Sequence, residues 1–249
     1  MANDNRNSRG RFANQLFRNV VGHYLAKKYN LKFFYGQEDD FKKIGINFFT
    51  NGQNFYENTI VFENEYTLDY YKYIVNEQFL FNNLKCNFNL TNLHCQHRES
   101  AQLVFDFINE ETTKTNIMTV NPYASRYNNN NDVFIHVRLD DASKHCPDLE
   151  YFDKALQTIS FENGYISSDS IDHELCQTLI SKYNLKVIEK DPYSTVQFGS
   201  TCKNVILSGG TYSWMIGLLA FFSNIIFPVQ KVRWYGDIYI FNTWKGIQS

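Results

Sequence analysis

The chain has 249 residues, enough for one large domain or two small ones, and its 43% hydrophobic and 17% aromatic residues can supply a packed core. This composition excludes a chain that is disordered throughout. The formal net charge of −2 lacks the strong basic excess of a general nucleic-acid binder, so we expect no nucleic-acid partner.

Cysteine usage and hydropathy predict a cytoplasmic protein. The first fifteen residues are polar and contain three arginines, unlike a secretory signal. The longest apolar stretch, residues 214–228, is too short to span a bilayer, so we expect no transmembrane segment and leave peripheral membrane contact and oligomeric state open. The run from His94 to His97 lacks a partner pair at zinc-finger spacing, so no metal site is predicted. The cysteines do not form a disulfide pattern, being five in number and widely spaced: Cys86, Cys95, Cys146, Cys176 and Cys202.

The first half of the chain has few regular patterns. Residues 1–9 are polar and predict a disordered tail. Apolar residues at helical spacing predict a helix over 19–28, which is preceded by a glycine-bearing turn. Residues 10–127 are assigned to an N-terminal, acceptor-side lobe, with further expected elements at 31–35 (strand), 58–63 (strand) and 100–108 (helix).

After a polar loop at 128–131, where we place the domain boundary, strands and helices alternate. Such alternation predicts βαβ units and a parallel sheet within a C-terminal lobe, residues 128–249. Ligands of parallel sheets bind at the carboxyl ends of the strands, so the residues that follow each strand are the candidates. The expected strands are 133–137, 164–167, 185–188, 205–207 and 224–227, and the expected helices are 149–159, 171–182, 194–202 and 211–222.

The strand at 133–137 leads into His136, Arg138, Asp140 and Asp141. An arginine at such a strand end can clamp a diphosphate with its planar fork of donors. In a transfer reaction without a metal, this fixed cation would stabilise the charge that develops on a leaving nucleotide. The alternative is a surface ion pair between Arg138 and Asp140 or Asp141.

Two later strand ends also carry polar side chains. Ser167, Ser168 and Asp169 could bind the base or ribose of a nucleotide, or else Ser168, Asp169 or Ser170 could cap the following helix. The turn after 205–207 could bind a phosphate at a helix N-terminus, or else be a plain turn capped by Thr211. Its candidate residues are Ser208, Thr211, Tyr212 and Ser213.

A fourth segment, near the start of the chain, contains the adjacent side-chain amides of Asn14 and Gln15, which could form hydrogen bonds to sugar hydroxyls. Alternatively, the segment is only the solvent-exposed start of a helix. Together the four segments resemble the α-1,2-fucosyltransferases (glycosyltransferase family 11) and, more distantly, the α-1,6 and protein O-fucosyltransferases. The family patterns Gly-x-x-x-Asn-Gln-x-Phe, His-x-Arg-Arg-x-Asp, Ile/Phe-Ser-x-Asp and Ile-Leu-Ser-x-x-Thr-x-Ser-Trp have counterparts here in the same order, and the second is matched at His136, Arg138 and Asp141. They fall at 10–17, 136–141, 166–169 and 206–214.

The resemblance implies an α/β, GT-B-like fold with two Rossmann-like lobes and parallel sheets, of which the C-terminal lobe is the more regular. It implies an inverting transfer of L-fucose from GDP-fucose to a glycan hydroxyl, with no metal or cofactor. Arg138 would hold the β-phosphate, and Asp141 is favoured as the base over Asp140 and His136. Ser167, Ser168 and Asp169 would face the guanosine. The segment 208–213 would hold the diphosphate, and Asn14 and Gln15 would line the cleft from the other lobe.

Three departures from the family pattern leave other functions open. Leu139 replaces the second arginine, so either one cation is lost or Arg11, Arg18 or Lys144 must substitute. Gly209 and Gly210 replace a bulkier, more polar pair. Residues 1–9 are polar where the family has an apolar strand, so either the first strand is missing or the reading frame begins late. The alternatives are a transferase with another nucleotide-sugar, a non-catalytic glycan-binding or scaffold protein, and a metal-dependent GT-A transferase. The chain lacks the Asp-x-Asp that a GT-A enzyme uses, for which residues 38–40 are the only substitute.

Overall fold

The computed structural model describes residues 3–5, 11–64, 67–81, 84–230 and 236–249, without the side chains of 3–5, 80–81 and 141–142. The chain divides into two compact units, Met1–Ile117 and Met118–Ser249. The division falls within a helix, earlier along the chain than the polar loop at 128–131. Both units contain helices and parallel strand pairs, so the α/β class with parallel sheets is confirmed.

The first unit is built around a buried helix, α1 (Phe12–Tyr29), which ends at Asn30 in the left-handed conformation (φ 52°). Its buried side chains lie on most sides of the helix, as is typical of a core helix rather than a surface one. Two small parallel sheets accompany it: β1 (Asn3–Asn5) with β2 (Phe33–Tyr35), and β3 (Thr59–Val61) with β4 (Asn87–Asn89). The helices are α2 (Glu38–Lys43), α3 (Tyr71–Val75), α4 (Gln78–Phe81), α5 (Arg98–Asn109) and α6 (Glu111–Val120).

The prediction of a disordered tail over residues 1–9, with a missing first strand, is wrong for Asn3–Asn5. These residues form β1 and pair in parallel with β2, from Asn3 opposite Phe33 to Asn5 opposite Tyr35. Strand pairing uses backbone groups that every residue except proline carries, so a polar segment can pair without an apolar pattern. The expected helix at 19–28 is also too short, because α1 already begins at Phe12.

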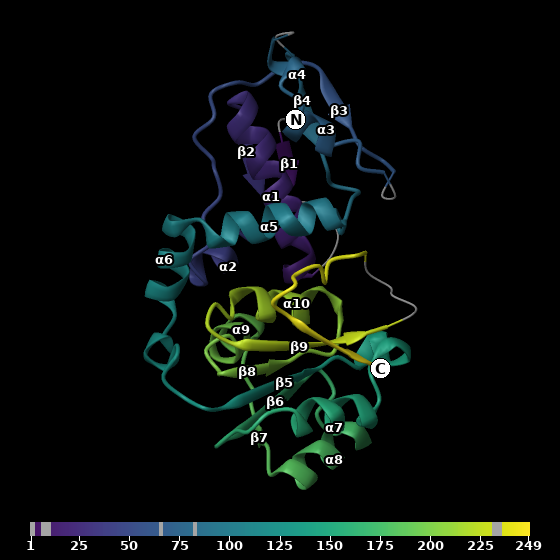
Figure 1. Ribbon diagram of the computed structural model, residues 1–249. Helices are drawn as coiled ribbons and strands as arrows, with labels where there is room; N and C mark the ends of the chain where they lie inside the picture. Colours follow the sequence, from purple (N-terminus) through teal and green to yellow (C-terminus); the bar gives the residue numbers. More distant parts are fainter. Residues whose placement is uncertain (1–2, 6–10, 65–66, 82–83, 231–235) are drawn as a thin grey trace. The chain divides into compact units, whose positions relative to one another are not determined.

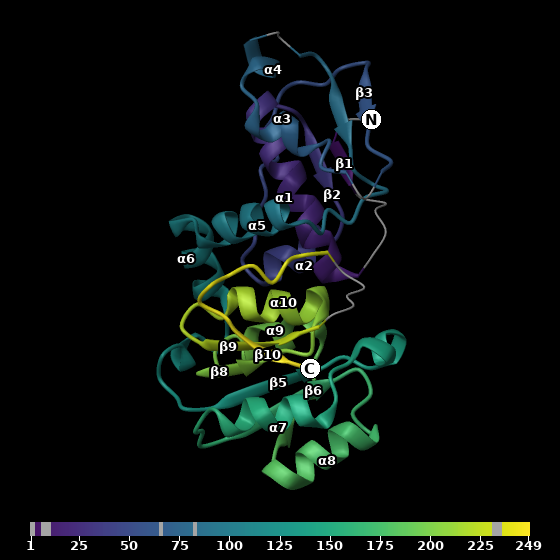
Figure 2. The same ribbon diagram turned by 45° about the vertical axis from the view of Figure 1, so that its right-hand side comes forward.

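The second unit contains a six-stranded parallel sheet in the order β10-β9-β8-β5-β6-β7. Counted from its first strand, this is the 3-2-1-4-5-6 order of a nucleotide-binding doubly wound sheet. Helices α9 and α10 cover one face and α7 and α8 the other, as both views show (Figure 1, Figure 2). The strands are β5 (Val133–Val137), β6 (Gly164–Ser168), β7 (Lys186–Val187), β8 (Asn204–Ile206), β9 (Asn224–Val229) and β10 (Lys245–Gln248). The helices are α7 (Leu149–Gln157), α8 (Glu174–Tyr183), α9 (Pro192–Gly199) and α10 (Gly210–Leu219), with short 3-10 turns η1 (Ala124–Arg126) and η2 (Asp140–His145).

Local sequence explains where the helices of this unit begin. Asp148 caps α7 by accepting a hydrogen bond from the backbone of Tyr151 at 3.1 Å. Asp191 caps α9, where Pro192 occupies the first helical position and needs no hydrogen-bond partner for its nitrogen. Every residue of β5 is buried, as expected for a central strand covered by helices on both faces.

Most predicted elements of the second unit are confirmed, with shifted ends. The helix expected at 171–182 begins only at Glu174 and is capped by His173, so the expectation that Ser168, Asp169 or Ser170 caps it is wrong. The strand β10 was not predicted, nor were β4 and the helices α2, α3, α4 and α6 in the first half. Within the described residues, none of the helices has the length and apolar character needed to cross a bilayer.

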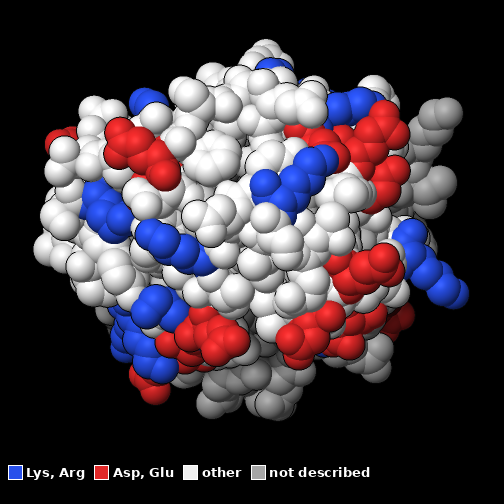
Figure 3. Space-filling model, turned by 90° about the horizontal axis from the view of Figure 1, so that it is seen from below, with Lys and Arg blue, Asp and Glu red and all other residues white. Residues whose placement is uncertain are grey.

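Opposite charges alternate on the face of the molecule drawn in Figure 3. On α7, Lys154 lies 2.6 Å from Glu150, and Lys182 of α8 lies 2.7 Å from Asp153. Exposed pairs of this kind contribute about 0–1 kcal/mol each, so they keep the surface polar rather than hold the helices together.

Candidate functional site

Three strand ends with polar side chains are neighbours at one edge of the six-stranded sheet. β5 pairs in parallel with β6 on one side and with β8 on the other, so their carboxyl ends lie together. The strand order reverses between β5 and β8, and ligands of such sheets bind in the crevice at that point. The residues there are His136 and Arg138 after or within β5, Asp169 after β6, and Ser208 after β8.

Arg138 forms an ion pair with Asp169, which follows the neighbouring strand β6. Its Nη1 donates to Asp169 Oδ2, and the side chains are only 16% and 22% exposed. The other carboxylate oxygen, Oδ1, accepts from the backbone nitrogen of Leu139 at 2.8 Å. The residues assigned to the phosphate and to the guanosine therefore contact each other directly.

A buried hydroxyl–imidazole cluster lies beside this pair. Ser213 Oγ is 2.5 Å from His136 Nδ1 and accepts a hydrogen bond from the backbone nitrogen of Ser208 at 3.3 Å. Ser208 Oγ accepts from the backbone nitrogen of Arg138 at 3.0 Å and lies 3.1 Å from Ser213 Oγ. The side chains of Ser208 and Ser213 are thus engaged inside the protein, where they join β5 to the start of α10 rather than face a ligand.

Burial and the neighbouring Arg138 guanidinium lower the pKa of His136 to about 3. At neutral pH the ring is uncharged, and it is only 5% exposed. A group with so low a pKa is a weak proton acceptor at pH 7, which disfavours His136 as the catalytic base. Its geometry matches a histidine that holds the strand end against α10.

The turn between β8 and α10 requires glycine. Gly209 and Gly210 have φ of 93° and 76°, in the region that side chains with a Cβ rarely adopt. This backbone conformation accounts for the Gly209-Gly210 departure from the family pattern. Thr211 does not cap the helix, because the N-cap is Gly209 and, as far as the structure describes the chain, no side chain supplies a cap bond. The first backbone N–H groups of α10 therefore lack intrahelical partners at the site.

Tyr212 connects α10 to its neighbours. Its hydroxyl donates to the carbonyl of Pro192 at 2.6 Å, and its ring lies 5.0 Å from that of His136. Burial raises its pKa, so it stays protonated. Ser168 has a local role, since its Oγ accepts from the backbone nitrogen of Ser170 at 3.0 Å, and Ser167 is buried within β6.

The burial of Leu139 explains why an arginine is absent at this position, where the family pattern has its second arginine. Leu139 is 3% exposed and belongs to the hydrophobic core beneath the sheet, with Val137 and Tyr151. Of the substitutes considered, Lys144 is exposed on η2 in the same unit. Arg18 is fully buried in the first unit, where its Nη1 donates to the carbonyl of Thr91 at 2.9 Å.

The expected base, Asp141, lies in η2 directly after the strand end, and its side chain lies outside the described residues. Asp140 begins the same turn and is exposed.

The amides of the first segment lie at the start of α1 in the other unit. Asn14 Oδ1 accepts from Gln96 Nε2 at 3.1 Å, and Gln15 is only 6% exposed. Arg11 is the exposed N-cap of this helix, and Gly10 lies outside the described residues. The side chain of Gln15 is therefore part of the core of its unit.

Sequence reasoning missed Tyr151 as a support of the site. Its hydroxyl donates to the carbonyl of Leu207 at 2.7 Å, directly before Ser208. The sequence held two signals for it, its place in an apolar helix face and the resemblance of residues 151–155 to the family's helix after the arginine motif, but neither predicted this contact.

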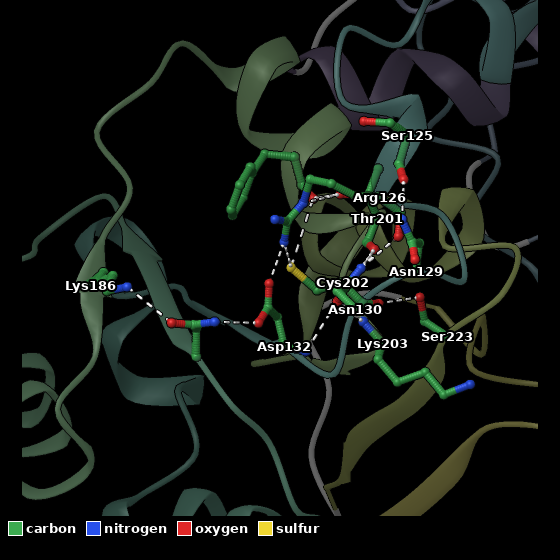
Figure 4. A network of polar contacts seen from close by, with 12 residues as sticks. Ser125, Arg126, Asn129, Asn130, Asp132, Lys186, Thr201, Cys202, Lys203 and Ser223 are labelled. Carbon is green, nitrogen blue, oxygen red and sulfur yellow. Dashed lines mark hydrogen bonds and ion pairs between the residues drawn. The ribbon is translucent and has the colours of Figure 1, made fainter.

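A second network, at the amino ends of β5 and β8, was also missed (Figure 4). Arg126 Nη2 donates to Asp132 Oδ2 at 2.8 Å and to Cys202 Sγ at 3.4 Å, and its guanidinium lies 4.7 Å from the ring centre of Phe198. Asn130 Nδ2 donates to the carbonyls of Arg126 and Thr201. Because every partner is a neighbouring protein group, this network fastens the polar loop to the sheet.

The thiols and the histidine-rich run were the other candidates for reactive or metal-binding groups. None of the five cysteines is in a disulfide, and burial raises the pKa of Cys202 to about 12, so that thiol is unreactive. Nowhere in the described residues do three or more His, Cys, Asp or Glu side chains gather as metal ligands, including the run at His94–His97.

Comparison with known proteins gives structural similarities only. No protein-family profile and no curated protein sequence matches the chain. It is similar in structure to NodZ α-1,6-fucosyltransferase soaked with GDP-fucose, with 11% identity and a TM-score of 0.43 over 84% of this chain and 89% of that one. It is also similar to POFUT1 in complex with GDP, with 11% identity and a TM-score of 0.44 over 89% of this chain and 97% of that one. Similarities of this size do not assign a function.

Proposed function

We propose that this chain is an inverting, metal-independent glycosyltransferase of the cytoplasm that transfers L-fucose from GDP-fucose to a glycan hydroxyl. One observation carries the proposal: Arg138 lies where the strand order of the sheet reverses, beside the N-terminus of α10. Both features favour an anion, because the guanidinium is a fixed cation and the first backbone N–H groups of a helix have no partners within the helix. The ordered motif segments support the proposal that this anion is the diphosphate of a GDP-sugar.

The chemistry of the transfer explains why a cation is needed there. Negative charge builds up on the departing GDP as the bond to the sugar breaks. Arg138 is held from two sides, by Ser208 through its backbone nitrogen and by Asp169 through its guanidinium, so little reorganisation is needed as charge develops. Asp141 is the proposed base that takes the proton of the acceptor hydroxyl, and the two units are proposed to form the two lobes of a GT-B enzyme.

The test is donor turnover and GDP binding in the wild-type chain and in variants of Arg138. Arg138→Ala should lower turnover about 10²–10³-fold, as for the loss of one charge-stabilising donor. Arg138→Lys should also be impaired, because a point charge does not reproduce the planar fork. Lys154→Ala, which removes an exposed and distant cation, is the matched control. Near-normal turnover in Arg138→Ala would refute the phosphate role.

Two further measurements separate the alternatives. Turnover should survive EDTA, whereas a GT-A enzyme would lose it with its metal. Calorimetry should show tighter binding of GDP than of UDP. Absence of binding at millimolar nucleotide would support a non-catalytic protein on a transferase fold. Tighter binding of UDP would indicate a UDP-sugar as the donor.

A further inference from the structure

The geometry points to Asp169 as a positioning residue for Arg138, an inference that rests on the proposed function. In this role Asp169 fixes the guanidinium that receives the diphosphate, and it acts on the donor through Arg138. The family resemblance instead assigns Asp169 to the guanosine. The two roles give opposite results when the phosphate and nucleoside parts of the donor are measured separately.

The strand register brings the two residues together. His136 pairs with Ser167, and Val137 pairs with Ser168, which are the last pairs of β5 and β6. The next residues along both strands are Arg138 and Asp169, so they lie opposite each other just beyond the sheet. Oppositely charged residues in such cross-strand positions attract each other.

Both oxygens of the Asp169 carboxylate are used to hold the end of β5. Oδ2 accepts from Arg138 Nη1, and Oδ1 accepts from the backbone nitrogen of Leu139 at 2.8 Å. The Leu139 side chain is buried in the core, which anchors the backbone group that Oδ1 contacts. One carboxylate thus fixes both the direction of the guanidinium and the path of the chain that carries it.

The other side of the Arg138 backbone is held by Ser208, whose Oγ accepts from its nitrogen at 3.0 Å. Arg138 is therefore fixed by β6 through its side chain and by the end of β8 through its backbone. Arginine has a long side chain with many rotamers, and holding it in one geometry removes an entropic cost from ligand binding. Removal of Asp169 should loosen the guanidinium while the backbone contact remains.

The experiment measures binding of inorganic pyrophosphate, guanosine and GDP to the wild-type chain and to Asp169→Asn by calorimetry. The substitution should weaken pyrophosphate binding roughly 10–100-fold, the equivalent of one charged hydrogen bond, and leave guanosine binding unchanged. Asp172→Asn is the matched control, because it makes the same change at an exposed position of the same loop and should alter neither. Weakened guanosine with unchanged pyrophosphate would overturn the inference in favour of direct base recognition. Tighter pyrophosphate binding would overturn it as well, because Asp169 would then compete with phosphate.

A double-mutant cycle tests whether Asp169 acts through Arg138. With Arg138→Ala in place, Asp169→Asn should have no further effect on pyrophosphate affinity or on kcat, whereas an independent contact would give additive losses. Unfolding by urea for each variant separates lost binding from lost folding. If the wild-type chain binds neither GDP nor pyrophosphate, the proposed function fails; if it binds both and the cycle is additive, only the role of Asp169 fails.

Discussion

Acid should destabilise the second unit through His136, and the size of the effect follows from its environment. Burial and Arg138 lower the pKa of this ring from 6.5 to about 3 in the folded protein. Because the folded-state pKa lies below the unfolded one, the full stability is present above pH 6.5 and is lost as the pH falls toward 3. Between these two pKa values the unfolded chain binds a proton at this histidine and the folded chain does not. Well below pH 6.5, the free energy of unfolding therefore falls by about 1.4 kcal/mol for each unit of pH. Between pH 6.5 and 5 the loss amounts to about 1.5 kcal/mol.

The assay is urea unfolding followed by tryptophan fluorescence at pH values from 6.5 to 5. All three tryptophans, Trp214, Trp234 and Trp244, belong to the second unit, so the signal reports its unfolding. His136→Gln keeps a hydrogen-bonding side chain beside Ser213 but cannot titrate. The variant should be less stable at every pH because of altered packing, but it should lack the His136 contribution to the slope.

Two controls identify the source of the slope. His173→Asn replaces an exposed histidine that caps α8 with another good N-cap residue, and it should keep the wild-type slope. His23 also has a pKa lowered to about 4, by burial and by Lys27, but it lies in the first unit. His23→Gln should therefore leave the fluorescence-detected slope of the second unit unchanged. An unaltered pH dependence in His136→Gln would refute the reasoning.

Two more substitutions test the supports of the sheet. Asp132→Asn should destabilise the second unit by about 3 kcal/mol, because it leaves the Arg126 guanidinium without its carboxylate partner. Urea unfolding measures this loss, and a value below about 1 kcal/mol would mean that the network is dispensable. Tyr151→Phe should lower the free energy of unfolding by about 1–2 kcal/mol, because the Leu207 carbonyl loses the hydroxyl that donates a hydrogen bond to it. The substitution should lower the affinity for the nucleotide-sugar less than Arg138→Ala does. Equal effects on affinity would place Tyr151 at the ligand rather than behind the strand.

Much of the second unit was predictable from sequence because its signals are local. The strand at 133–137 was predicted with its observed ends, since five successive buried residues between polar segments are typical of a central parallel strand. The helices after it carry one apolar face each, which again is a property of neighbouring residues. The first unit was less predictable, because its strands are three residues long and β1 is polar throughout.

The sequence by itself determined which residues follow each strand, and therefore that His136, Arg138, Asp169 and Ser208 would lie at one edge of the sheet. Only the tertiary structure decided their partners: Arg138 pairs with Asp169, which lies 31 positions further along the chain at the end of the neighbouring strand, and Leu139 turns into the core. The physical reason is that an ion pair depends on the register between strands and on which side chains burial leaves within reach. Both are set by contacts between segments far apart in the chain, and no local pattern of residues records them.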